Sequence, residues 1–119
     1  MNDRLQVNYF CFFKKRNDMF KELLGTFSQG CCIESPFYCD YGSNIHLEEN
    51  VFMNFNCTLL DICEIRIGSG TLLAPGVQIY SATHPIDPIK RRTTEFGKPI
   101  KIGRDCWIGG AAIICPGIY

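Results

Sequence analysis

A six-residue repeat in the middle of the chain decides the fold. Three units follow one another there, namely Ile67-Gly-Ser-Gly-Thr-Leu, Leu73-Ala-Pro-Gly-Val-Gln and Ile79-Tyr-Ser-Ala-Thr-His. Three more end the sequence, namely Ile102-Gly-Arg-Asp-Cys-Trp, Ile108-Gly-Gly-Ala-Ala-Ile and Ile114-Cys-Pro-Gly-Ile-Tyr. The first position is Ile or Leu in all six units, and the fifth is small in five of them. A looser register extends upstream with a six-residue spacing, at Ile33, Cys39, Ile45, Val51 and Cys57.

This period is typical of a triangular β-solenoid. Each edge of a coil needs an apolar residue that points inward and then a small residue where the chain bends, so three edges close a coil of about 18 residues. Successive coils stack, extend three parallel sheets and bury a continuous aliphatic column. Residues 67–84 and 102–119 are each predicted to form one coil.

Residues 85–101 interrupt the period between these two coils. They contain three prolines and the basic run Lys90-Arg91-Arg92. An insertion of this length in a compact solenoid is usually functional, although a passive surface loop is the alternative. We therefore predict one loop that protrudes from the solenoid.

The region before the repeat favours a helix from Asn17 to Phe27. An apolar stripe with a spacing of three to four residues supports it, formed by Met19, Phe20, Leu23, Leu24 and Phe27. Gly25 or Gly30 would end this helix. We predict an N-terminal helical segment, residues 1–32, that packs on one side of a β-helix domain, residues 33–119, with the inserted loop 85–101.

Length and composition exclude several classes of protein. The chain has 119 residues, enough for one domain, and its 12 basic and 12 acidic side chains cancel. A net charge of zero gives no electrostatic reason to expect nucleic acid or an anionic membrane as partner. No run approaches the roughly 20 apolar residues that cross a bilayer. The apolar run 9–13 ends in Lys14-Lys15-Arg16 and does not resemble a signal peptide, which favours the cytoplasm.

The eight cysteines show no C-x-x-C spacing, so the usual zinc and thioredoxin patterns are absent. Two of them, Cys39 and Cys57, take aliphatic positions of the looser repeat. We therefore interpret the cysteines as small packing residues. No metal site is predicted.

Two histidines are the candidate bases. His46 lies between apolar neighbours, which favours a solvent-facing position on a strand. His84 ends the unit before the insertion, and Pro85 restricts its backbone to an extended conformation. An imidazole at a coil corner below a loop can act as a general base, and a corner histidine with structural contacts only is the alternative.

Six short motifs add a family resemblance. They are Phe37-Tyr-Cys-Asp-Tyr-Gly-Ser-Asn-Ile45, Asn54-Phe-Asn56, Leu73-Ala-Pro75, Ala82-Thr-His-Pro-Ile-Asp87, Gly97-Lys-Pro99 and Trp107-Ile-Gly-Gly110. Together they resemble the maltose and galactoside O-acetyltransferase branch of the hexapeptide-repeat acyltransferases, over about four-fifths of the chain. The resemblance implies a mainly β protein, folded as a left-handed parallel β-helix with a short N-terminal helix and one protruding loop.

The resemblance also implies roles on the donor side of a site. His84 would take the proton from an acceptor sugar hydroxyl that attacks the thioester of acetyl-CoA. Gly110, with Gly109 beside it, would lie at acetyl-CoA and offer backbone N–H groups to the oxyanion. Bare coil geometry is the alternative for Gly109. Trp107 would pack on the pantetheine arm, or alternatively lie at a subunit contact.

On the acceptor side, Asn54 matches a family asparagine that lies near the acceptor and the histidine. The alternative is a corner asparagine that bonds its own backbone. Asp40 falls at an acceptor-contact position, and Asp61 falls near one. Phe52 stands where the galactoside enzymes have a tyrosine, which removes one hydroxyl donor. The basic run of the loop is either solvated or close to the phosphates of CoA.

We therefore predict an acetyl-CoA-dependent O-acetyltransferase that acts on a sugar hydroxyl. By resemblance it is a homotrimer with active sites between subunits. The repeat stops at Tyr119 in the last slot of a coil, so we expect a fragment or a truncated paralogue. The alternative is a non-catalytic remnant that keeps the fold and the subunit contact but cannot bind CoA. A γ-class carbonic anhydrase on the same fold is disfavoured, because it needs three histidine ligands to zinc and the sequence has two histidines.

Overall fold

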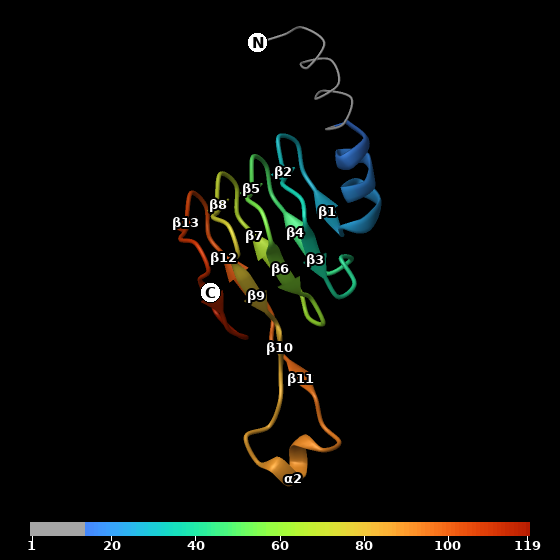
Figure 1. Cartoon of the computed structure of the whole chain (residues 1–119), viewed down its shortest axis with the longest axis vertical. Helices are drawn as coiled ribbons and strands as arrows, with labels where there is room; N and C mark the ends of the chain where they lie inside the picture. Colours follow the sequence, from blue (N-terminus) through green and yellow to red (C-terminus); the bar gives the residue numbers. More distant parts are fainter. Residues whose placement is uncertain (1–13) are drawn as a thin grey trace, which may run out of the picture.

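Three parallel sheets form the walls of a solenoid in the computed structural model, which describes residues 14–119 (Figure 1). Sheet A has the order β1-β4-β7-β12, with strands Thr26–Phe27, Ile45–Leu47, Ile65–Ile67 and Ile100–Ile102. Sheet B has the order β13-β8-β5-β2, with strands Trp107–Ile108, Leu72–Leu73, Phe52–Met53 and Cys32–Ile33. Sheet C has the order β14-β9-β6-β3, with strands Ile113–Ile114, Gln78–Tyr80, Cys57–Leu60 and Phe37–Cys39.

Each turn of the solenoid is longer than three six-residue units. Ile45 pairs with Ile65, and Phe52 pairs with Leu72, so equivalent positions lie 20 residues apart. The two extra residues lie at the corner that joins sheet C to sheet A, which we call the C–A corner. It holds residues 40–44 in one turn and 61–64 in the next. The six-residue repeat predicted the walls but not this enlarged corner. The period is defined by the inward aliphatic residues of the walls and not by the residues of the corner.

The inward side chains of the walls form one continuous core. Within residues 14–119, twelve large side chains are fully buried, namely Ile33, Ile45, Leu47, Met53, Leu59, Ile65, Ile67, Leu73, Ile79, Ile100, Val51 and Val77. Cys31 and Cys57 are buried in the same core, as the packing interpretation predicted, whereas Cys115 is exposed. The seven described cysteines are free thiols, and Cys11 lies outside the described residues.

The helix before the solenoid differs from its predicted bounds. Residues 14–23 are helical, so the helix includes residues 14–16, which precede the predicted start at Asn17, and it ends four residues earlier than predicted. Phe20 and Leu24 are buried, but Met19 is 70% exposed and Leu23 is 41% exposed. The stripe was therefore too wide, because only one of each adjacent apolar pair reaches the core.

Phe27 belongs to the solenoid and not to the helix. Its strand, β1, pairs in parallel with β4 through Thr26 and His46. The Phe27 ring stacks on the ring of Phe20 with centroids 5.8 Å apart. The first strand of sheet A thus lies within residues 1–32, which were predicted to form the N-terminal helical segment.

The insertion leaves the solenoid as a narrow ribbon (Figure 1, orange). Strand β10 (Ala82–Thr83) pairs antiparallel with β11 (Phe96–Gly97), and helix α2 (Pro88–Arg91) lies at the far end. The Asp87 carboxylate caps α2 by accepting a hydrogen bond from the Ile89 N–H at 2.8 Å. The protruding loop is therefore confirmed.

Among residues 14–119, no helix has the length and apolarity that crossing a bilayer requires.

Candidate active site

His84 lies where the insertion leaves the C–A corner, directly after β10. Its side chain is exposed and lines a hollow of about 440 Å³. The other lining residues come from both arms of the ribbon and from the last coil, namely Thr83, Pro85, Ile86, Phe96, Lys98 and Pro116. His84, the predicted base, is the only histidine in this lining.

A backbone carbonyl orients the imidazole of His84. Its Nδ1 lies 3.4 Å from the carbonyl oxygen of Thr94 on the opposite arm. A carbonyl oxygen only accepts hydrogen bonds, so this contact favours the tautomer with the proton on Nδ1. Nε2 then keeps its lone pair and can accept a proton. Thr94 was not predicted, because no sequence pattern reveals a backbone contact across ten residues.

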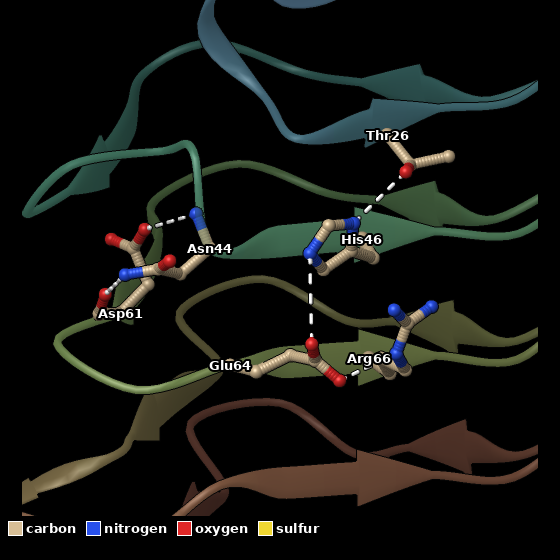
Figure 2. Close-up of polar contacts among 6 residues, drawn as sticks. All are labelled: Thr26, Asn44, His46, Asp61, Glu64 and Arg66. Carbon is tan, nitrogen blue, oxygen red and sulfur yellow. Dashed lines mark hydrogen bonds and ion pairs between the residues drawn. The ribbon is translucent and has the colours of Figure 1, made fainter.

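Asp61 occupies the same C–A corner one turn earlier, and its carboxylate is directed into the protein. The residue is fully buried. Its carboxylate accepts hydrogen bonds from the N–H groups of Asp40, Tyr41 and Asn44 at 3.1, 2.9 and 3.2 Å. The Asn44 side chain donates to the Asp61 carbonyl at 2.8 Å (Figure 2). In this structure Asp61 shapes the corner, and any acceptor contact stays a prediction.

Asp40 is an exposed acid of the C–A corner. Local desolvation raises its pKa, and the negative charges of Asp61 and Glu95 raise it further. Glu95 lies on the returning arm of the insertion, just before β11. A charge on the loop therefore acts on the carboxyl group of Asp40 at the corner. Asp40, Asp61 and His84 thus come from the C–A corners of successive turns.

The remaining predicted residues lie on the other side of sheet C. Asn54 follows β5 at the corner between sheets B and C, and its Oδ1 accepts a hydrogen bond from the Phe55 N–H at 2.8 Å. This is the backbone contact that the alternative interpretation predicted. Gly109 and Gly110 follow β13 at the same corner. A Cβ at Gly109 would meet nothing within 4 Å, so this backbone is open to a ligand.

Trp107 lies on the outer face of sheet B and is 81% exposed. Its register partners continue an apolar row across the sheet through Leu72, Phe52 and Cys32. Phe52 and Cys32 are half-buried, and Leu72 is exposed. The indole therefore has a large free face, as either predicted role requires.

One copy of the chain divides the predicted site between two corners. His84, Asp40 and Asp61 lie at the C–A corner, whereas Asn54, Gly109 and Gly110 lie at the corner between sheets B and C. Sheet C separates the two groups. The short motifs did not reveal this division, because the place of a residue within its six-residue unit does not say which of the three corners it occupies.

His46 has a separate set of polar partners on the outer face of sheet A (Figure 2). Its Nδ1 lies 2.9 Å from the Thr26 hydroxyl, and its Nε2 lies 3.9 Å from the Glu64 carboxylate. Glu64 in turn pairs with Arg66. These contacts fit the predicted strand position of His46, half-buried on the wall. Within residues 14–119, no group of three His, Cys, Asp or Glu side chains could hold a metal ion.

Known proteins match both the sequence and the fold. Nodulation protein L of Rhizobium meliloti is 48% identical over 99 residues, which is 82% of this chain and 54% of that protein. A maltose O-acetyltransferase from Clostridium difficile 630 matches with a TM-score of 0.86 and 48% identity, over 88% of this chain and 57% of that one. A galactoside acetyltransferase in complex with coenzyme A matches with a TM-score of 0.85 and 38% identity, over 87% and 52%. No family model matches the sequence.

Sequence and fold together relate the chain to the hexapeptide-repeat acetyltransferases, and the solenoid is a left-handed parallel β-helix. Within that superfamily it matches the maltose and galactoside O-acetyltransferase branch, as the motifs predicted. The chain spans about half the length of the curated relatives that it matches.

Proposed function

We propose that this chain carries the catalytic base of an acetyl-CoA-dependent O-acetyltransferase that modifies a sugar hydroxyl. The observation that carries the proposal is His84, held by the Thr94 carbonyl at the mouth of a hollow. The match to maltose and galactoside acetyltransferases supports the reaction class and the acetyl donor.

In the proposed reaction, Nε2 of neutral His84 takes the proton of the acceptor hydroxyl as its oxygen attacks the thioester carbonyl. The Thr94 carbonyl keeps Nδ1 protonated and stabilises the imidazolium that forms. Collapse of the tetrahedral intermediate breaks the carbon–sulfur bond, and His84 returns its proton to the CoA thiolate. The products are the sugar ester and free CoA.

Backbone groups at the corner between sheets B and C suit the oxyanion of this intermediate. Gly109 and Gly110 leave their main chain open, and a Cβ at Gly110 would lie 3.5 Å from the Pro75 carbonyl oxygen. Open N–H groups can approach a developing negative charge closely. Trp107 offers an exposed indole for the pantetheine arm.

For the acceptor we propose Asp40 and Asn54 as direct contacts, and Asp61 as the residue that holds the Asp40 backbone in place. Carboxylate and amide groups suit a ligand with several hydroxyls. Phe52 contributes no hydroxyl on sheet B. We therefore propose a maltose-type acceptor rather than a galactoside.

The division of the site between two corners supports a homotrimer. A neighbouring subunit would bring its own Asn54, Gly109 and Gly110 opposite the His84 of the first, so each active site would form between two copies. Free thiols on the seven described cysteines are consistent with the reducing cytoplasm that we propose as the location.

The test is acetyl transfer by the purified protein, with acetyl-CoA as donor and maltose, glucose and a galactoside as acceptors. Mass spectrometry of the sugar detects an added acetyl group, and a thiol reagent detects free CoA. We expect one acetyl group per released thiol, with maltose or glucose preferred. Titration calorimetry with CoA distinguishes the enzyme from the alternative, a non-catalytic remnant. A protein that binds no CoA and transfers no acetyl group is such a remnant.

A further inference from the structure

The two arms of the insertion meet the solenoid at one buried serine. Ser81 is fully buried, and its Oγ donates to the Leu60 carbonyl at 2.6 Å and accepts from the Cys63 N–H at 2.9 Å. Its backbone N–H donates to the same Leu60 carbonyl at 3.0 Å. Its carbonyl accepts from the Lys98 N–H on the returning arm, also at 3.0 Å. Ser81 therefore ties the outgoing arm, the returning arm and the preceding coil together.

Gly97 completes this joint from the returning arm, where it pairs with Ala82. A Cβ at Gly97 would lie 2.7 Å from the Ser81 carbonyl oxygen, 2.8 Å from the Cys63 sulfur and 2.9 Å from a methyl of Ile62. All three distances are shorter than an ordinary van der Waals contact, and one of the three atoms belongs to the backbone. A larger residue at position 97 therefore has to push the returning arm away from Ser81.

This joint lies close to His84 and to its partner Thr94 along both arms. The chain runs three residues from Ser81 to His84 on one arm, and three residues from Thr94 to Gly97 on the other. At 3.4 Å, the contact between His84 Nδ1 and the Thr94 carbonyl is near the upper limit for a hydrogen bond. A shift of a few tenths of an ångström between the arms therefore breaks it. The imidazole can then rotate and adopt either tautomer.

We propose that Ser81 and Gly97 form a positioning pair that keeps His84 in the tautomer with a free Nε2. The pair acts through the imidazole and does not touch the acceptor or the acetyl donor. The consequence for catalysis rests on the proposed function. The consequence for the tautomer of His84 does not, because it follows from the packing of the two arms.

The test compares Gly97→Ala with the unmodified protein by ¹H–¹⁵N correlation NMR of the histidine rings. The sequence has two histidines, so His46 on sheet A is an internal reference. Above the pH of imidazole titration we expect one tautomer for His84 in the unmodified protein and a mixture in Gly97→Ala, with His46 unchanged. We expect kcat to fall about 10- to 100-fold, while the KM for acetyl-CoA stays within about 3-fold.

Two further variants make the test specific. Gly103→Ala adds the same methyl group where a Cβ would meet only the Cys106 sulfur, at 3.8 Å, so both histidines and kcat should stay unchanged. Ser81→Ala removes the hydroxyl without adding bulk and should reproduce the mixed tautomer of His84. Thermal unfolding reveals whether Gly97→Ala folds. If it does not, Ser81→Ala alone provides the test.

An unmixed His84 tautomer in both Gly97→Ala and Ser81→Ala would overturn the proposal. So would equal losses in Gly97→Ala and Gly103→Ala, or signals of His46 that shift together with those of His84, because these outcomes indicate general damage. If the unmodified protein transfers no acetyl group, the proposed function fails, and the tautomer measurement still decides the role of the pair.

Discussion

The solenoid walls and the inserted ribbon use similar residues in opposite ways. Ile65 on a wall is fully buried, whereas Ile86 on the ribbon is 95% exposed, and no residue of α2 is buried. Each wall residue contacts equivalent residues in the coils above and below, so the repeat supplies the stability. The ribbon has no such neighbours. The candidate base lies where the chain leaves the repeat, so the part that holds the fold is separate from the part that carries the candidate base.

The C–A corner shows the same contrast within one structural position. In one turn, Asp61 closes this corner with three hydrogen bonds to backbone N–H groups. In the next turn, the equivalent position is Ser81, and the chain opens into the insertion. A corner that tolerates extra residues thus became the place where a loop could carry a functional group.

The largest effect on stability is expected from shortening a core residue on a wall. Ile65→Ala leaves a cavity in the aliphatic column and should lower the free energy of unfolding by about 2–5 kcal/mol. Ile89→Ala makes the same change on the ribbon, where the side chain is 62% exposed, and should cost less than about 0.5 kcal/mol. Urea denaturation measures both. Equal losses would contradict the division between wall and ribbon.

The next largest effect concerns two aspartates that both accept backbone hydrogen bonds. Asp61→Ala leaves three backbone N–H groups of the corner without their buried acceptor and should cost about 2–4 kcal/mol. Asp61→Asn keeps one oxygen and should cost less. Asp87→Ala removes the cap of α2 but should leave global unfolding unchanged, because α2 buries nothing. Denaturation midpoints give the order, and a loss from Asp87→Ala as large as that from Asp61→Ala would disprove it.

A smaller effect is expected where the chain rejoins the solenoid after the ribbon. The Thr71 hydroxyl donates to the Gly103 carbonyl at 2.7 Å and accepts from the Cys106 N–H at 3.1 Å. Thr71→Val keeps the shape and removes both bonds, so unfolding should become easier by about 1–2 kcal/mol. Thr58→Val on the outer face of β6 is the matched control. Identical melting temperatures for the two variants would rule out this role of Thr71.

The smallest effect is a pH dependence at the C–A corner. Desolvation and the charges of Asp61 and Glu95 raise the pKa of Asp40 in the folded protein, so folding disfavours the ionised form. This destabilisation is present above the folded pKa and vanishes below the unfolded value of about 3.9. Asp40→Asn should therefore raise the free energy of unfolding at pH 7 by less than about 0.5 kcal/mol, because the side chain is exposed, and the melting temperature should rise slightly. Melting curves at pH 7 and pH 3.5 test whether this gain disappears in acid.

Hydrophobic periodicity was sufficient to predict the walls, the parallel sheets and the place of the insertion. It failed where neighbouring apolar residues differ in burial, as Met19 and Phe20 do, because burial there depends on how the helix rests on the first coil. It also gave turns two residues too short. The buried carboxylate that accommodates the longer corner, Asp61, has no counterpart in the six-residue pattern.

The candidate site was only partly predictable. His84 was predicted as the base from its place before the insertion and from its motif, and its catalytic role stays a prediction. Its partner Thr94, and the joint of Ser81 with Gly97, depend on how the two arms of the ribbon pair, and no local signal encodes that pairing. The motifs also could not show that Asn54 lies at a different corner from His84.

The catalytic role proposed for His84 is tested most sharply by measuring turnover and stability together in His84→Ala. We expect kcat for acetyl transfer to fall by about 10²–10⁴-fold. The free energy of unfolding should stay within about 0.5 kcal/mol, because the side chain is exposed. His46→Ala on sheet A is the matched control and should keep its kcat. Full activity in His84→Ala, or a loss explained by unfolding, would contradict a catalytic role for His84.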